Sequence, residues 1–203
     1  FKQYSNEGAL YLSDDFEVSD ALKIHAGLRY SSFQHSGYIS FRDYVKNDFL
    51  TNNDNYRHIE PRLSFRYRLS TTSSIKGAYT QNYQYVHLAL LSGRSLPSDL
   101  WVPSSSVIKP KFSTQYAIGY FKNLQDNMYE TSIETYYKSM SNLIEYKEGV
   151  LPEDNTNTNS DDAFTFGDGD SYGVEFLIKK NKGKTTGWIG YTLSKTTRYF
   201  DEV

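Results

Sequence analysis

Polar and apolar residues alternate along most of this chain with a period of two. In the stretch ALKIHAGLRYS, residues 21–31, every second side chain is apolar or aromatic, and Lys23, His25 and Arg29 lie between them. Residues 62–69 repeat the pattern, with arginines on one parity and Leu, Phe and Tyr on the other. Because neighbouring side chains of a strand point to opposite faces of a sheet, this alternation predicts β-strands, and a helical period is almost absent.

The connections between the predicted strands are of two sizes, which alternate along the chain. Short polar turns, typical of tight hairpins, are expected near residues 18–21, 70–73, 124–127 and 181–184. Longer links are expected near residues 34–58, 87–111 and 147–169. About eight strands therefore form an all-β, antiparallel up-and-down meander in which every long loop lies at one end. Several strands exceed the roughly 5–6 residues of an ordinary strand.

The two faces of such a sheet admit two interpretations. In a soluble protein the apolar faces pack into a two-sheet core, whereas in a membrane barrel they meet lipid and the charged faces line a hydrated lumen. Long strands, glycines inside strands and one-sided loops favour the barrel. We also expect aromatic residues near the strand ends to form girdles at the bilayer boundaries. They are Phe33, Tyr67, Tyr83, Tyr85, Phe121, Tyr137 and Trp188.

Composition excludes several classes of protein. The net charge of -2 at pH 7 gives no basic field for nucleic acid. Cysteine is absent, which excludes disulfides and thiolate metal sites. No run approaches the roughly 18 apolar residues of a spanning helix. The opening FKQYSNEGALYL has no features of a signal peptide, so we expect an internal piece or a processed product.

The charged face and one long link supply the candidate site residues. The candidates for the lumen are Arg29, Arg62, Arg66, Arg68, Lys76, Glu130 and Glu134. Paired carboxylates can signal acid–base catalysis, but Glu130 and Glu134 share their face with cations, so we expect ion pairs instead. In the link at residues 90–105, Trp101 offers an aromatic platform and Arg94 a fork for carboxylates, which makes both candidates for ligand contact. Alternatively, Leu96, Leu100 and Trp101 pack this loop against the rim.

Metal and catalytic sites are not expected. The four histidines, at positions 25, 35, 58 and 87, lack the spacing of metal ligands. The stretch FGDGDSYG, residues 166–173, leads into a strand and lacks the order of acidic residues in a Ca²⁺ loop. No Ser/His/Asp or Cys/His combination is evident. We therefore predict no catalytic residue, no metal, no cofactor and a protein that is not an enzyme.

Several segments, taken in their order along the chain, resemble the C-terminal β-barrel of TonB-dependent outer-membrane receptors. In LPSDLWVPSSSVIKPKFSTQYAIGYFKNL, residues 96–124, a loop with Trp and Pro is followed by IKP, a Gln-Tyr strand start and an aromatic strand. Further matching segments are residues 14–33, 59–85, 136–146, 171–180 and 187–196. The resemblance spans nearly the whole chain and is weakest in the loops at residues 34–57 and 147–169.

This resemblance implies that residues 1–203 are part of a transmembrane barrel of about 22 strands closed by a plug. It implies a receptor in the outer membrane of a Gram-negative bacterium that imports a siderophore, vitamin, peptide or glycan with energy delivered by TonB. The implied partners are outer-membrane lipid, the plug domain of the same parent chain, TonB, a small-molecule or oligomeric nutrient and a surface lipoprotein. No plug or TonB-contact segment matches this chain. An alternative is a soluble or surface-exposed β-sheet module that binds glycans or proteins through Trp101 and the loop at 147–169.

Overall fold

The computed structural model describes residues 4–36, 53–89, 100–147 and 163–200. Its strands are β1 (Tyr4–Glu17), β2 (Leu22–Ser36), β3 (Asn53–Arg68), β4 (Ser73–Gln84), β5 (Val86–Ala89), β6 (Leu100–Pro103), β7 (Lys111–Leu124), β8 (Tyr129–Tyr146), β9 (Phe164–Lys180) and β10 (Gly187–Phe200). Within these residues, no helix is long and apolar enough to cross a membrane.

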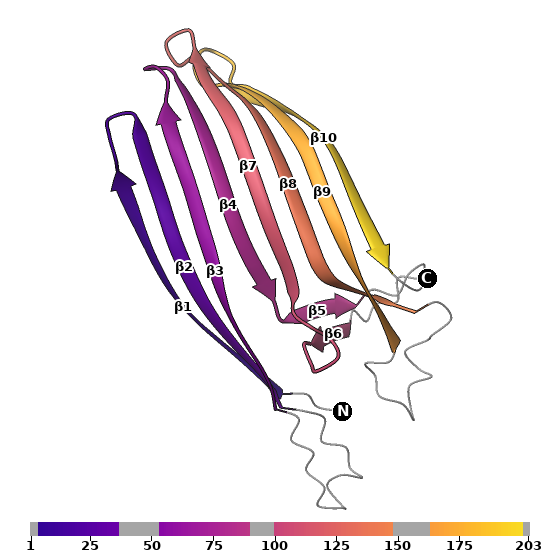
Figure 1. The fold of residues 1–203 in the computed structure, drawn as a ribbon. Coiled ribbons are helices and arrows are strands. Elements are labelled where there is room, and N and C mark those ends of the chain that lie inside the picture. Colours follow the sequence, from indigo (N-terminus) through magenta and orange to yellow (C-terminus); the bar gives the residue numbers. More distant parts are fainter. Residues whose placement is uncertain (1–3, 37–52, 90–99, 148–162, 201–203) are drawn as a thin grey trace, which may run out of the picture.

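Eight long strands form one sheet in the order β1-β2-β3-β4-β7-β8-β9-β10. All neighbours are antiparallel, and each pairs with the next long strand along the chain. Strands β5 and β6 form a separate two-stranded hairpin between β4 and β7. The long strands bend together in a single curved layer (Figure 1). The predicted antiparallel meander of about eight strands is confirmed.

Four short connections lie together at one end of the sheet (Figure 1). The β7–β8 turn contains three successive residues with positive φ, Gln125 at 50°, Asp126 at 54° and Asn127 at 63°. Asp and Asn tolerate this left-handed conformation better than most residues. In the β9–β10 connection, Gly183 has a φ of 111°, a conformation that favours glycine. The predicted long links fall largely on residues 37–52, 90–99 and 148–162, which lie outside the described residues.

The strand register aligns residues of like character into rows that cross the sheet. One row contains Ile75, Tyr120, Ile133, Phe176 and Tyr191. We call the face that carries these residues the apolar face and the opposite one the charged face. No second sheet covers the apolar face in the described part of the chain, where Leu63, Phe65, Ile133 and Phe176 are 38–48% exposed. The two-sheet core of the soluble interpretation is therefore not formed there.

The main buried apolar cluster lies away from the short connections. It comprises Val102, Ile108, Ile144, Tyr146, Ala163 and Phe164, which come from β6, the segment after it, β8, the residue before β9 and the first residue of β9. The register of β8 against β9 shifts between Met140 and Leu143. In this irregular stretch Asn142 has a φ of 58°, and its Nδ2 donates a hydrogen bond to the Pro110 carbonyl at 2.9 Å. The bulge therefore ties β8 to the segment that precedes β7.

Candidate functional site

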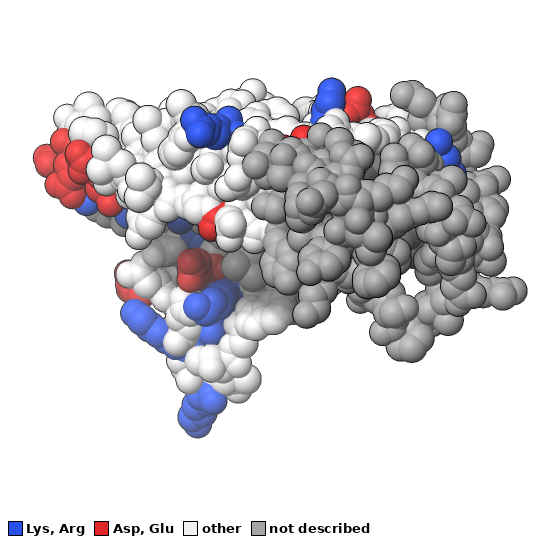
Figure 2. All heavy atoms as spheres, turned by 90° about the horizontal axis from the view of Figure 1, so that it is seen from below, with Lys and Arg blue, Asp and Glu red and all other residues white. Residues whose placement is uncertain are grey.

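All seven predicted lumen residues lie on the charged face. Alternation and register place there Arg29, Arg62, Arg66, Arg68, Lys76, Glu130 and Glu134. Figure 2 shows basic and acidic side chains gathered in the hollow of the sheet. This hollow has a volume of about 520 Å³, and Lys23, Arg66, Lys76 and Glu134 are among the residues that line it. The candidate site is thus a concave charged wall.

In one row of this wall, three cations lie side by side and apart from Glu134. Lys23, Arg66 and Lys76 stand directly opposite one another on β2, β3 and β4. The same row continues through Gly119 on β7 to Glu134 on β8. With strands about 4.8 Å apart, three spacings put the Arg66 and Glu134 backbones roughly 14 Å from each other. Like charges directly opposite are unfavourable, so the cationic half favours an anionic partner.

The boundary between the two halves is shaped by a glycine. The Lys76 ammonium lies 3.9 Å from the centroid of the Phe121 ring, in cation–π geometry. A Cβ atom on Gly119 would lie 2.7 Å from Cγ of Glu134 and 2.9 Å from Cε2 of Phe121. Only a residue without a side chain leaves room for the Phe121 ring and the Glu134 stem together. The absence of a side chain at Gly119 thus allows both Lys76 and Glu134 to lie close to the Phe121 ring.

Ion pairs on the charged face join neighbouring strands. Glu130 lies 4.0 Å from Lys179, and Arg29 lies 3.6 Å from both Glu60 and Glu7. Among the described residues, no ion pair joins Glu130 or Glu134 to an arginine of β3. Two strands separate β3 from β8, a distance that alternation alone does not reveal. Of the two glutamates for which ion pairs were expected, Glu130 has one with Lys179, a partner that only the register identifies, whereas no ion pair of Glu134 is present among the described residues.

A group of rings and hydroxyls lies beside the charged face, beyond the hollow. Phe33 is 1% and Tyr85 is 2% exposed, and their rings stack at a centroid distance of 5.0 Å. The Tyr85 hydroxyl lies 2.6 Å from Ser31 Oγ and 2.9 Å from His58 Nδ1, and the His58 ring stacks on Tyr83 at 3.7 Å. We call these five residues the loop-end cluster. Sequence reasoning missed it because its members come from three separate segments.

Several predicted girdle aromatics are therefore not on the apolar face, and that part of the prediction is wrong. Phe33 and Tyr85 are buried in the loop-end cluster. Phe121 lies under Lys76, and Trp188 stands opposite Lys179, so both share the charged face. Phe33, Phe121 and Trp188 are one position out of step with the apolar residues of their own strands. One residue of offset reverses the face of a side chain.

The β5–β6 hairpin is fastened to the sheet by polar contacts. The Tyr56 hydroxyl donates to the Ser105 carbonyl at 2.6 Å, and the Ser106 N–H donates to Asp54 at 2.7 Å. His87 is fully buried, with Nε2 2.9 Å from Ser104 Oγ. Burial, helped by the nearby positive charge of a lysine, lowers the pKa of His87 to about 4. The imidazole is therefore neutral near pH 7.

Trp101 lies on this hairpin and is 61% exposed, whereas the adjacent Val102 is 5% exposed. The hairpin thus buries the valine and presents the indole outward. Ligand contact by Trp101 stays a prediction. The other candidate, Arg94, lies outside the described residues. Within the described chain, no group of three or more His, Cys, Asp or Glu side chains is placed to hold a metal ion.

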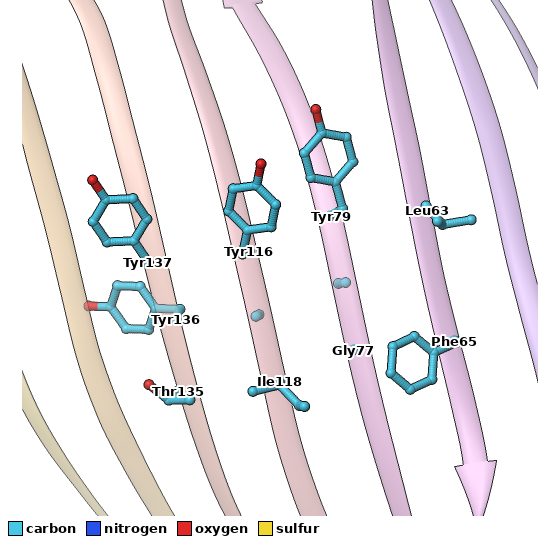
Figure 3. A pocket seen from close by; sticks show the side chains of 11 residues that line it. Leu63, Phe65, Gly77, Tyr79, Tyr116, Ile118, Thr135, Tyr136 and Tyr137 are labelled. Atoms are coloured by element: carbon cyan, nitrogen blue, oxygen red, sulfur yellow. The ribbon is translucent and has the colours of Figure 1, made fainter.

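The apolar face carries a row of four tyrosines, Tyr79, Tyr116, Tyr137 and Tyr172, which stand opposite one another on β4, β7, β8 and β9. The hydroxyls of the first three point away from the short connections (Figure 3). The Tyr137 hydroxyl donates to Asp170 at 2.6 Å, and Lys195 stands opposite Tyr172. The tyrosine row therefore marks the level at which the apolar face becomes polar.

The sequence profile of one protein family, described as TonB dependent receptor-like, beta-barrel, matches residues 1–202. This chain belongs to that family. No curated protein matches it. As a TonB-dependent receptor-like β-barrel segment, the curved eight-stranded sheet is a part of the wall of a larger barrel. The family and the solved neighbours are receptors and transporters rather than enzymes.

Solved receptors share this fold. The FrpB iron transporter of Neisseria meningitidis (F3-3 variant) matches with a TM-score of 0.66 and 12% identity, over 100% of this chain and 28% of that chain. The ferripyoverdine receptor of the Pseudomonas aeruginosa outer membrane matches with a TM-score of 0.64 and 20% identity, over 96% of this chain and 23% of that chain. The alcaligin outer-membrane receptor FauA of Bordetella pertussis matches with a TM-score of 0.60 and 16% identity, over 96% of this chain and 30% of that chain. The chain thus spans less than a third of the length of each.

Proposed function

We propose that this chain forms part of the wall of an outer-membrane receptor that takes up a scarce nutrient by TonB-dependent transport in a Gram-negative bacterium. The contrast between the two faces carries the proposal. On β8, alternate residues from Tyr129 to Tyr137 are uncharged, whereas Glu130, Glu134 and Lys138 occupy positions between or beside them. Nine residues match the roughly 9–11 of a tilted membrane-spanning strand. The apolar face then meets lipid, and the charged face lines the lumen.

The proposed topology follows from the two ends of the sheet. The short connections lie at the periplasmic side, and the longer links lie outside the cell. The tyrosine hydroxyls support this arrangement, because they point toward the long-link end, as expected for a girdle at the outer boundary of the bilayer. Trp101 then lies on the side from which the nutrient arrives, and Arg94, outside the described residues, stays a predicted ligand contact.

The charged wall suits a receptor whose lumen holds a plug and passes cargo. No ion pair in the described part of the chain involves Arg66 or Lys76, so both are available to acidic groups of a plug domain or to an anionic nutrient. TonB acts through the plug, and a surface lipoprotein over the long links completes the proposed partners. Ferric siderophores are the first nutrient class to test, ahead of vitamins, peptides and glycans, because two solved neighbours are described as receptors for pyoverdine and alcaligin.

A fluorescence experiment tests the orientation of the two faces. The chain has no native cysteine, so Phe65→Cys and Arg66→Cys place a bimane label on adjacent residues of opposite faces. The receptor containing this segment is reconstituted in phosphatidylethanolamine–phosphatidylglycerol vesicles. Spin-labelled phospholipid should quench the label at position 65, and aqueous iodide the label at position 66. Lipid quenching at neither position would instead support the soluble binding module, and the reverse pattern would contradict the proposed orientation.

A further inference from the structure

The apolar face is hollowed at one place by a groove of about 430 Å³ that crosses β3, β4, β7 and β8. Its upper edge is formed by Tyr79, Tyr116 and Tyr137, and its lower part by Phe65 and Ile118 (Figure 3). None of its eleven lining residues carries a charge. The groove is therefore an apolar depression with hydroxyl groups along one edge.

Gly77 lies within the depression and has no side chain. Ala78 and Ala117 also line it where β4 and β7 run side by side, but alternation directs their methyl groups to the charged face. A Cβ atom on Gly77 would lie 2.3 Å from Cε1 of Phe65, so the phenyl ring lies across the space that a side chain would fill. The floor beside Gly77 is therefore mostly backbone. This local lack of bulk contrasts with the next row of the same face, where Tyr120 stands opposite Ile133.

We propose that this groove holds one acyl chain of a bilayer lipid at a fixed position on the receptor wall. The inference rests on the proposed function, because it requires the apolar face to be in contact with lipid. The groove is continuous with that face, and the tyrosine hydroxyls at its edge are placed to contact a headgroup or ester oxygen. A hydrocarbon chain is the occupant that fits, since an uncharged groove inside a bilayer has no groups to pair with a charged ligand.

Photo-cross-linking tests the proposal. The receptor containing this segment is reconstituted in phosphatidylethanolamine–phosphatidylglycerol vesicles with a small share of phosphatidylcholine that carries a diazirine in the half of one acyl chain nearest the headgroup. Peptide mapping then locates the adducts. We expect the yield at residues of the groove, such as Tyr79 and Ile118, to exceed the yield at Ile178 and Ile189 several-fold. Equal yields over the whole apolar face would overturn the proposal.

A matched pair of variants separates groove binding from general contact with lipid. Ile118 lies in the groove and is 52% exposed, whereas Ile178 lies outside its lining and is 55% exposed. Ile118→Trp should fill the groove and reduce the adducts at Tyr79 several-fold, and Ile178→Trp should leave them unchanged. Equal effects of the two variants would contradict a defined site. Adducts nowhere on the apolar face would contradict the membrane orientation itself, so the two failures are distinguishable.

Discussion

The apolar and charged faces use alternate residues of the same strands but are organised differently. On the apolar face, the rows stay uncharged across several strands, as in the row of four tyrosines. On the charged face, a row changes sign along its length, from Lys23 and Arg66 to Glu134. A lipid environment is the same for every strand, so uniform rows suit it. A face that varies from strand to strand suits a partner with a structure of its own.

The largest expected effect comes from a charge placed on the apolar face. Ile133 lies midway between Tyr129 and Tyr137, near the centre of the proposed bilayer span. Ile133→Arg should lower the free energy of unfolding by about 2–4 kcal/mol, the cost of a cation at the bilayer midplane on a barrel. Urea unfolding in phospholipid vesicles measures the change. Ser132→Arg, next to it on the charged face, is the control and should lower the free energy of unfolding much less. Equal losses of unfolding free energy would contradict the assignment of one face to lipid and the other to water.

The second prediction concerns the fit of Phe65 over Gly77. Gly77→Ala places a methyl group inside the volume of the phenyl ring, and because this half-exposed ring can turn aside we expect a cost of about 1 kcal/mol, the lower end of the range for overpacking. The same unfolding experiment measures the loss. At Gly190 an added Cβ meets its nearest neighbour, a ring atom of Trp188, at 3.5 Å, so Gly190→Ala is the control on the charged face. The two faces are packed alike if both changes cost the same.

The third prediction is a local dependence on pH in the β5–β6 hairpin, which lies outside the spanning strands. The folded-state pKa of His87 is about 4, below its ordinary value of 6.5. The unfolded hairpin therefore binds the proton more readily, and the stabilisation present above pH 6.5 is lost as the pH falls toward 4. Amide hydrogen exchange, corrected for its intrinsic pH dependence, should show faster opening of Leu88 and Val102. His87→Gln should flatten this dependence, and amides around Ile133 should not show it.

The smallest effect is expected from the contact between Lys76 and Phe121. Cation–π pairs at exposed sites contribute about 0.5–1 kcal/mol, so a double-mutant cycle with Lys76→Met and Phe121→Leu should return a coupling energy of this size. The matched cycle of Lys76→Met with Phe65→Leu, a phenylalanine of the apolar face, should return no coupling. A coupling energy of zero in both cycles would show that Lys76 and Phe121 do not stabilise the charged face through this contact.

Alternation predicted the strands and the face of every candidate lumen residue, because parity depends only on local sequence. It also places Phe33, Phe121 and Trp188 on the charged face, but we assigned them to the aromatic girdle because of their residue type, and that assignment was wrong. Cross-strand partners, such as Lys179 for Glu130, were beyond reach because they depend on register between strands. The loop-end cluster was beyond reach for another reason. Tyr85 lies between β4 and β5, where the chain leaves the sheet and alternation no longer applies.

The order of the strands in the sheet follows their order in the chain, with only the β5–β6 hairpin set aside. A sheet of this kind can be extended at one edge, because each new hairpin pairs with the strand that immediately precedes it. Strand pairing then joins segments close in sequence, which keeps the entropy of loop closure low. Unpaired backbone groups are costly in a bilayer. At each stage of such assembly only the two edge strands need a neighbour or a chaperone, and in the complete segment these are β1 and β10.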